Sequence, residues 1–136
     1  MTKIVLLDAV LSIANNNLQD WCSKLELSDE FEDKETTTFG SGGAVELLGG
    51  LEKFEAAITF KQDYDDNQLD EIMWALRRQV VTFSGKAKDA AVSASNPLYT
   101  GSLLINKWVP IAGSVGDVAE VDVTFPGSGP LARATA

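Results

Sequence analysis

Regular alternation of apolar and polar residues is the feature of this sequence that most constrains its fold. The clearest example is the segment 119–125, whose apolar positions are Ala119, Val121, Val123 and Phe125. The polar positions between them are Glu120, Asp122 and Thr124. Because successive side chains of a strand point to opposite faces, this pattern predicts a strand with one face on a core and one in water.

Other segments repeat the pattern and predict further strands. Near the start, one face would carry Val5, Leu7, Ala9, Leu11 and Ile13. A second strand would bury Leu25, Leu27 and Phe31, and a third would bury Phe54, Ala56, Ile58 and Phe60. The stretches VVTFSG at 80–85 and SLLINKWVPIAG at 102–113 predict two more. The sequence therefore predicts a mainly β fold of two packed antiparallel sheets, arranged as a sandwich or barrel.

One helix is predicted between these strands, in DDNQLDEIMWALRRQ at 65–79. Asp65 is placed as the N-cap, with Gln68 completing a capping box. An apolar stripe with helical spacing is formed by Leu69, Ile72, Met73 and Leu76. Trp74 projects away from this stripe, since each helical residue turns by about 100°.

Two segments have no packing pattern of their own. One is a glycine-rich connection at about 29–50, predicted to be a long loop, and such loops are usually functional or disordered. The other is the tail at about 127–136, which is predicted to be a flexible arm. No linker divides the chain, so residues 1–136 are predicted to form a single domain.

The sequence offers little material for catalysis or metal binding. It has no histidine and one cysteine, Cys22, so nucleophiles lack their usual base and zinc lacks its usual ligands. The stretch DYDDNQ at 63–68 begins like a calcium loop. Its sixth position is Gln68 and its twelfth is Trp74, where glycine and glutamate are needed. We therefore expect no catalytic residues, no metal, no cofactor and no enzyme activity.

The net charge of −9 also limits the partners of this protein. Tight binding to nucleic acid needs lysine and arginine to displace counterions from phosphates, so it is not expected. DNA can still pass close to an acidic surface without adhering to it. No apolar run approaches the ~20 residues that cross a bilayer, so no membrane partner is expected either.

The predicted strands leave open how their edges are covered, because a small sheet protein must hide its edges or use them. A monomeric β-sandwich, serving as a binding module, would cover them with loops. A ring-forming subunit would instead close them by joining copies of itself. The long loop, the off-stripe Trp74 and the unanchored tail favour the ring.

The last third of the chain carries a resemblance to a known family. Its elements are NPLYTG from Asn96, SVGD at 114–117 and TFPGSG at 124–129. Together with a Gly50-Leu51 step into a strand that ends Gln-Asp-Tyr, they resemble the major tail proteins of long-tailed, non-contractile phages, especially those infecting actinobacteria. The resemblance covers nearly the whole chain, and it is specific in the last third and looser before it.

This resemblance implies the phage tail tube fold, a β-sandwich with a flanking helix. Six copies would form a ring, and stacked rings would form a tube that conducts DNA out of the virion. The expected partners are other copies of the chain, the tape-measure, tail tip and tail terminator proteins, and phage DNA that passes through without specific binding. The protein would be located in the virion tail, after assembly in the host cytoplasm. A tail terminator or another ring-forming virion protein is the alternative within related folds.

Two sets of candidate residues follow. Contacts between subunits are predicted at Phe39, Gly42, Gly43, Val45, Leu47, Trp74, Leu131 and Arg133. An acidic wall facing the tube lumen would repel phosphates within a Debye length of ~8 Å. The residues predicted to form this wall are Glu26, Glu30, Glu32, Glu55, Glu120 and Asp122.

Overall fold

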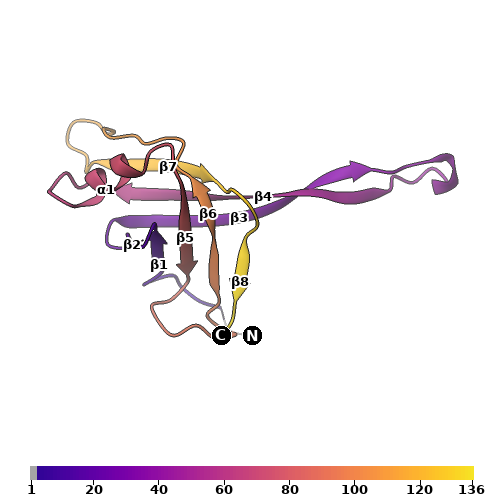
Figure 1. The fold of residues 1–136 in the computed structure, drawn as a ribbon, viewed down its shortest axis with the longest axis horizontal. Helices are drawn as coiled ribbons and strands as arrows, with labels where there is room; N and C mark the ends of the chain where they lie inside the picture. Colours follow the sequence, from indigo (N-terminus) through magenta and orange to yellow (C-terminus); the bar gives the residue numbers. More distant parts are fainter. Residues whose placement is uncertain (1–2) are drawn as a thin grey trace.

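The computed structural model describes residues 3–136, which form two antiparallel sheets and one α-helix (Figure 1). The first sheet has the strand order β2-β1-β5-β6-β8. Its strands are β1 (Val10–Ile13), β2 (Asn16–Asn17), β5 (Val80–Lys86), β6 (Leu98–Leu104) and β8 (Ala132–Ala134). The second sheet has the order β3-β4-β7. Its strands are β3 (Cys22–Glu35), β4 (Leu47–Lys61) and β7 (Glu120–Pro126). The predicted fold class is thus confirmed.

The chain passes from the second sheet to the first at Gly127, immediately after β7. The N–H of Gly127 donates to the carbonyl of Phe54 at 2.7 Å, which holds it to β4. Gly127 also forms an isolated bridge with Leu103, and the N–H of Ser128 donates to the Ser102 carbonyl at 2.8 Å. The crossing therefore joins the two sheets along one side of the core.

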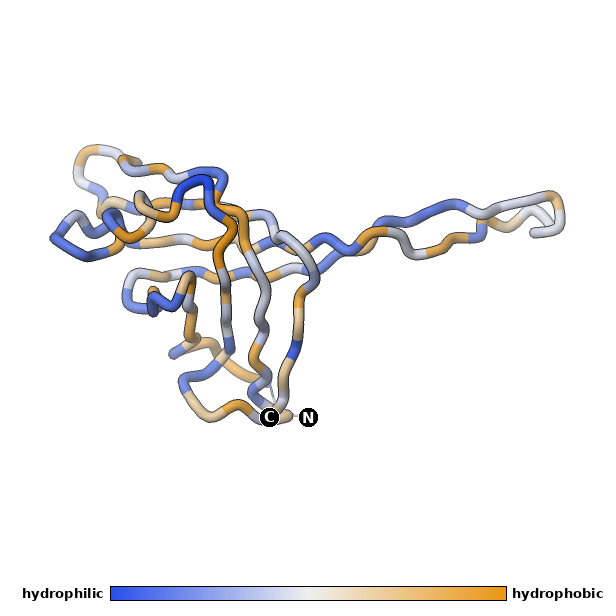
Figure 2. Tube along the Cα trace, in the orientation of Figure 1, coloured by the Kyte–Doolittle hydropathy of each residue, from blue (hydrophilic) through white to orange (hydrophobic). Residues whose placement is uncertain are grey.

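The core lies between the two sheets and under the helix α1 (Leu69–Leu76). Figure 2 shows apolar and polar residues alternating along several of the strands that surround this region. Residues buried to 2% exposure or less include Leu11, Ile13, Phe54, Ala56, Ile58, Phe60, Leu69, Met73, Phe83, Leu103, Ile105, Val121 and Phe125. Alternation in β4 and β7 therefore predicted the buried face of each strand correctly.

The ring of Phe54 packs directly against two glycines, one at the sheet crossing and one in β6. A Cβ built on Gly127 would lie 2.4 Å from this ring, and a Cβ on Gly101 would lie 2.7 Å from its Cζ. Distances below 3.0 Å are not tolerated by a packed aromatic ring without movement. Both positions are therefore restricted to glycine by the space that Phe54 occupies.

The helix is shorter than predicted and starts at a different residue. Its N-cap is Gln68, with no hydrogen bond from a capping side chain, rather than Asp65. Asn67 adopts a left-handed conformation with φ of 61°, which ends the preceding turn, and its N–H is bound by the Glu71 carboxylate. The Glu71 side chain, from inside the first turn, thus binds a backbone N–H at the start of the helix, which is the role that the sequence pattern assigned to Asp65.

Two predicted strands also have different limits. The first contains only Val10–Ile13, and Val5 and Leu7 lie exposed before it. Its pairing partner β5 ends at Lys86 opposite Val10, so earlier residues have no strand beside them. The strand predicted at 102–113 instead occupies 98–104, since the N–H of Ile105 turns to the Gln79 carbonyl at 2.9 Å. Pro110 lacks the N–H needed to resume a ladder.

Candidate assembly surfaces

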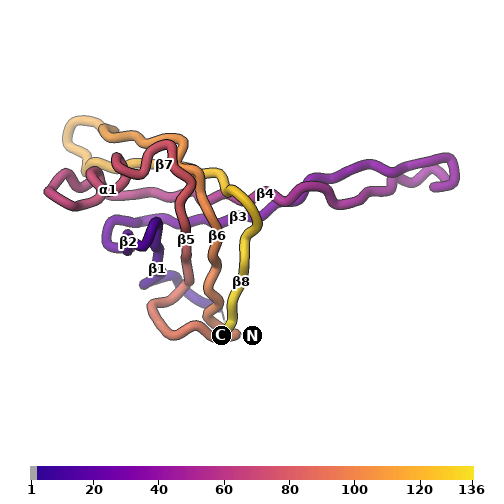
Figure 3. Tube along the Cα trace, viewed as in Figure 1, coloured from indigo at the N-terminus to yellow at the C-terminus, as the bar shows by residue number. Residues whose placement is uncertain are grey.

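The most prominent feature of the molecule is a two-stranded arm that projects beyond both sheets (Figures 1 and 3). β3 and β4 pair from Cys22 opposite Phe60 out to Glu35 opposite Leu47. β7 accompanies β4 only between Glu55 and Lys61, so residues 30–52 continue as a hairpin without a third strand. We call residues 30–52 the arm.

The arm corrects the prediction of a long loop at about 29–50. Residues 29–35 and 47–50 are strand, and only 36–46 connect them. The segment 29–35 contains charged residues at nearly every position, which hides the alternation expected of a strand with one buried face. That pattern is absent because both faces of the arm are exposed within this subunit.

The tip of the arm has a defined structure. A short 3-10 helix (Phe39–Ser41) is capped by Thr38 and ends at Gly42, which has φ of 66°. Gly43 follows with φ of 88°, so both glycines take the left-handed conformations that other residues avoid. The N–H of Glu46 donates to Thr37 Oγ1 at 2.9 Å and closes the turn. Gly42 and Gly43 thus shape the tip that was predicted to be a subunit contact.

The arm exposes large apolar side chains to solvent. Phe39 is fully exposed at the tip. The other exposed apolar residues of the arm are Phe31, Val45, Leu47, Leu48 and Leu51. A two-stranded hairpin has marginal stability in water without packing on a further element. The predicted contact residues Phe39, Val45 and Leu47 therefore lie together on a surface that lacks a partner within residues 3–136.

The outward face of the second sheet carries most of the predicted acidic wall. Cross-strand pairing places Ser28 opposite Glu55, Lys61 opposite Glu120, and Thr59 opposite Asp122. Facing side chains share one side of a sheet, so this face is opposite to the buried Phe54 and Val121. We call it the acidic face, and its charged residues are Lys24, Glu26, Glu30, Lys53, Glu55, Lys61, Glu120 and Asp122.

Lysines reduce the negative charge of the acidic face. Lys61 Nζ lies 2.8 Å from Glu120 Oε2, and Lys24 Nζ lies 3.9 Å from Glu26 Oε2. Asp122 accepts a hydrogen bond from Thr59 Oγ1 at 2.5 Å, and Thr59 is buried although it lies on this face. The face keeps a net negative charge, since five carboxylates stand against three lysines.

Glu32 lies apart from the other acids of this set. It sits on the arm within the register shift between Phe31 and Asp33, where it has no paired residue on β4. Its carboxylate is 3.1 Å from Lys34 Nζ on the same strand. Glu32 therefore belongs to the charge pattern of the arm, and alternation alone could not separate it from the acids of the sheet.

Trp74 lies on the surface of α1, as its position outside the apolar stripe predicted. Its side chain is 50% exposed, and the Arg77 guanidinium carbon lies 3.3 Å from the centre of its ring. Arg77 Nε also donates to the Trp74 carbonyl at 3.0 Å, which fixes the guanidinium over the indole. One face of the indole is thus covered by a cation, and the rest remains available for contact.

The C-terminal segment differs from the predicted loose arm, because it forms strand β8 against β6 of its own subunit. The N–H of Leu131 donates to Glu52 Oε2 at 3.2 Å, and the Leu131 side chain packs half-buried against the core. Arg133 pairs opposite Tyr99, and its Nε donates to the Tyr99 hydroxyl at 3.4 Å. The C-terminal segment forms a strand because the free edge of β6 offers backbone hydrogen bonds to three further residues.

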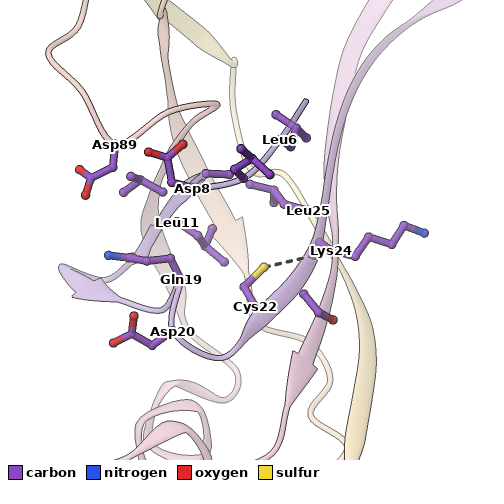
Figure 4. Close-up of a pocket in the computed structure, with 13 residues that line it drawn as sticks. Leu6, Asp8, Leu11, Gln19, Asp20, Cys22, Lys24, Leu25 and Asp89 are labelled. Atoms are coloured by element: carbon purple, nitrogen blue, oxygen red, sulfur yellow. Dashed lines mark hydrogen bonds between the residues drawn. The ribbon is translucent and has the colours of Figure 1, made fainter. Parts of the chain in front are cut away.

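A cavity of about 550 Å³ lies beside β1 and contains Cys22 (Figure 4). The thiol Sγ donates to the Lys24 carbonyl at 3.2 Å, and burial raises the pKa of Cys22 above its usual value. A protonated thiol is a poor nucleophile. The carboxylates of Asp8, Asp20 and Asp89 also line this cavity. Within residues 3–136, no three histidine, cysteine or acidic side chains gather in a way that could hold a metal ion.

The helical part of residues 3–136 offers no segment that has both the length and the apolar character of a membrane span.

Comparisons with known proteins establish the fold. No protein family model matches the chain, and no curated protein sequence matches it. Among solved structures, it is similar to a chain from the virion of a native gene transfer agent particle, with a TM-score of 0.73 and 19% identity. The match covers 93% of this chain and 95% of that chain. A similar overall fold therefore occurs in a chain of that virion with very different sequence.

Proposed function

We propose that this protein is a structural subunit of a phage-like virion, and that it assembles as stacked hexameric rings into the tube of a tail. The observation that carries the proposal is the arm, a long hairpin with exposed apolar residues and no partner in its own subunit. The similarity of fold to a virion component and the resemblance to major tail proteins support the same role.

Ring closure would use the free edges of the second sheet. In the order β3-β4-β7, both outer strands are paired on one side only. If β3 of one subunit lies beside β7 of its neighbour, the sheet continues around the ring and no edge is left exposed. This arrangement gives each ring a continuous β wall and leaves the arm free to extend out of it.

The acidic face would then line the lumen. Its net negative charge repels the phosphates of a passing duplex at short range, and screening by salt confines this effect to about 8 Å. The lysines at 24, 53 and 61 keep the repulsion moderate and do not form a continuous basic track. DNA would therefore pass along this wall without being retained.

Negative-stain electron microscopy of the purified protein tests this proposal, with sedimentation at several salt concentrations as a second measurement. Tubes of uniform diameter are the expected outcome. Single rings that never stack would favour a terminator-like role and contradict the tube. A monomer at every concentration would overturn the assembly role and favour a monomeric binding module.

A further inference from the structure

Basic residues follow Trp74 at the end of α1, where the chain is bonded to the segment that follows β6. The N–H of Arg78 donates to the Ile105 carbonyl at 2.7 Å, and the Ile105 N–H donates to Gln79 at 2.9 Å. These bonds hold the residues after α1 against the segment that leads to Lys107. We call the exposed residues of this region the basic patch, which consists of Trp74, Arg77, Arg78 and Lys107.

The charges of the basic patch are not neutralised within the subunit. None of the ion pairs among residues 3–136 includes one of its three cations. The two acids of α1 have other partners: Asp70 accepts from Trp108 Nε1 at 3.0 Å, and Glu71 binds the N–H of Asn67. In a chain with a net charge of −9, this basic cluster is available to an acidic partner.

The arm has the complementary chemistry. From Glu30 to Leu48 it carries five carboxylates and one lysine, and that lysine is paired with Glu32. Asp33 and Glu35 share one face of the arm with Leu47, since Glu35 pairs with Leu47 and alternate residues point the same way. The arm therefore presents unpaired acids beside exposed apolar residues, with Phe39 at its tip. The patch presents cations beside an exposed indole.

The two surfaces lie toward opposite ends of the molecule, with α1 at one end and the arm at the other (Figure 1). The six residues from Glu30 to Glu35 extend the arm by about 20 Å before its tip begins, at ~3.4 Å per residue. A contact between two different surfaces is heterologous, and when all copies point the same way it repeats from copy to copy and builds an open stack.

We propose that the basic patch is the receptor for the arm of a subunit in the adjacent ring. This inference rests on the proposed function, and it names the two halves of the ring-to-ring contact. Acidic residues of the arm pair with Arg77, Arg78 and Lys107, and an apolar residue of the arm packs on the free part of Trp74. An aromatic anchor surrounded by charges is a common centre of a protein interface.

Charge reversal on each side, followed by mixing, tests the contact. The patch variant Arg77→Glu with Arg78→Glu and the arm variant Asp33→Lys with Glu35→Lys should each form rings but lose tubes. An equal mixture of the two should regain tubes, because each patch then meets an arm of opposite charge. The variant with all four substitutions should also regain tubes by itself.

The matched control is Lys86→Glu with Lys88→Glu, which makes the same change of charge away from the patch and should keep tubes. Thermal unfolding of each subunit checks that the folded state is retained. Tubes of normal length from the patch variant, or no recovery in the mixture, would overturn the receptor assignment. Absence of rings and tubes from the unaltered chain would instead contradict the proposed function itself.

Discussion

The backbone N–H of Leu131 donates a hydrogen bond to Glu52 Oε2 at 3.2 Å, which ties the C-terminal segment to the base of the arm. A chain that ends at Gly129 loses this bond, strand β8 and the half-buried Leu131 side chain. Partial burial of a leucine contributes about 1 kcal/mol. We therefore expect the truncated subunit to fold with slightly lower stability, measured as the midpoint of urea unfolding. An unchanged midpoint would show that β8 adds nothing to the folded subunit.

The contact between Phe54 and Gly127 predicts that one methyl group added at Gly127 strongly lowers the stability of the fold. Gly127→Ala would place a Cβ 2.4 Å from the Phe54 ring, so the ring or the sheet crossing must move. Overpacking of this kind lowers the free energy of unfolding by about 1–3 kcal/mol. Chemical denaturation measures the change. Gly49→Ala is the control, since no atom lies within 4 Å of its built Cβ, and equal effects of the two substitutions would contradict the packing described.

Trp74→Ala should weaken assembly and leave the subunit folded. The side chain is half-exposed and contacts Arg77 rather than the core residues of α1. Truncation of an aromatic anchor commonly costs 2 kcal/mol or more of binding energy, about a 30-fold loss of affinity. Sedimentation measures the assembly and thermal unfolding measures the subunit. A marked drop in the melting temperature with assembly unchanged would place Trp74 in the core.

The arm tip can be removed without breaking the hairpin. Replacing residues 37–45 with Asn-Gly joins Thr36 to Glu46, which are already bonded at 2.9 Å, through a two-residue turn. We expect this variant to fold and to form single rings, because it retains the second sheet and loses Phe39. Electron microscopy distinguishes rings from tubes. Normal tubes from this variant would exclude the tip from the ring-to-ring contact.

We expect Asp29, at the base of the arm, to make the stability of the folded state depend slightly on pH. Loss of water around its carboxyl raises the pKa of Asp29, and repulsion from the Glu52 carboxylate adds to this. Because the pKa of Asp29 is raised in the folded state, the contribution of this group to stability is fully present below the ordinary pKa of 3.8. That contribution is lost as the pH rises through the raised value. Asp29→Asn should therefore be more stable than the unaltered chain at pH 7.

The difference between the two proteins should disappear at pH 3, where both side chains are neutral. Comparing urea midpoints of the pair at the two pH values isolates Asp29 from the other carboxyls. A difference that is unchanged at pH 3 would assign the effect to packing of the amide rather than to charge.

Strands with one buried face could be recognised from sequence, and strands exposed on both faces could not. β4 and β7 pack on one core, so Phe54 and Val121 alternate with polar neighbours and identify their faces. The arm has water on both sides, so nothing selects an alternating pattern around Asp33. The sequence also held no sign that β8 would add to β6, because a three-residue strand is too short to show a period.

Some features of the candidate sites could likewise be predicted from local sequence, and others depend on the tertiary fold. Exposure of Trp74 follows from its angle on the helix, which is a local property. The separation of Glu32 from the acidic face depends on the register shift between Phe31 and Asp33, which is a property of how β3 and β4 pair in the tertiary fold. The basic patch depends on the bond between Arg78 and Ile105, residues that are well separated along the chain.

Electron cryo-microscopy of the assembled protein tests the central claim most directly. The account predicts a tube of stacked six-membered rings in which each arm leaves its own ring and contacts a subunit of the next ring. It also predicts that Glu55 and Asp122 face the lumen. A reconstruction in which the arms stay within their own ring, or in which the acidic face lies on the outside of the tube, would contradict it.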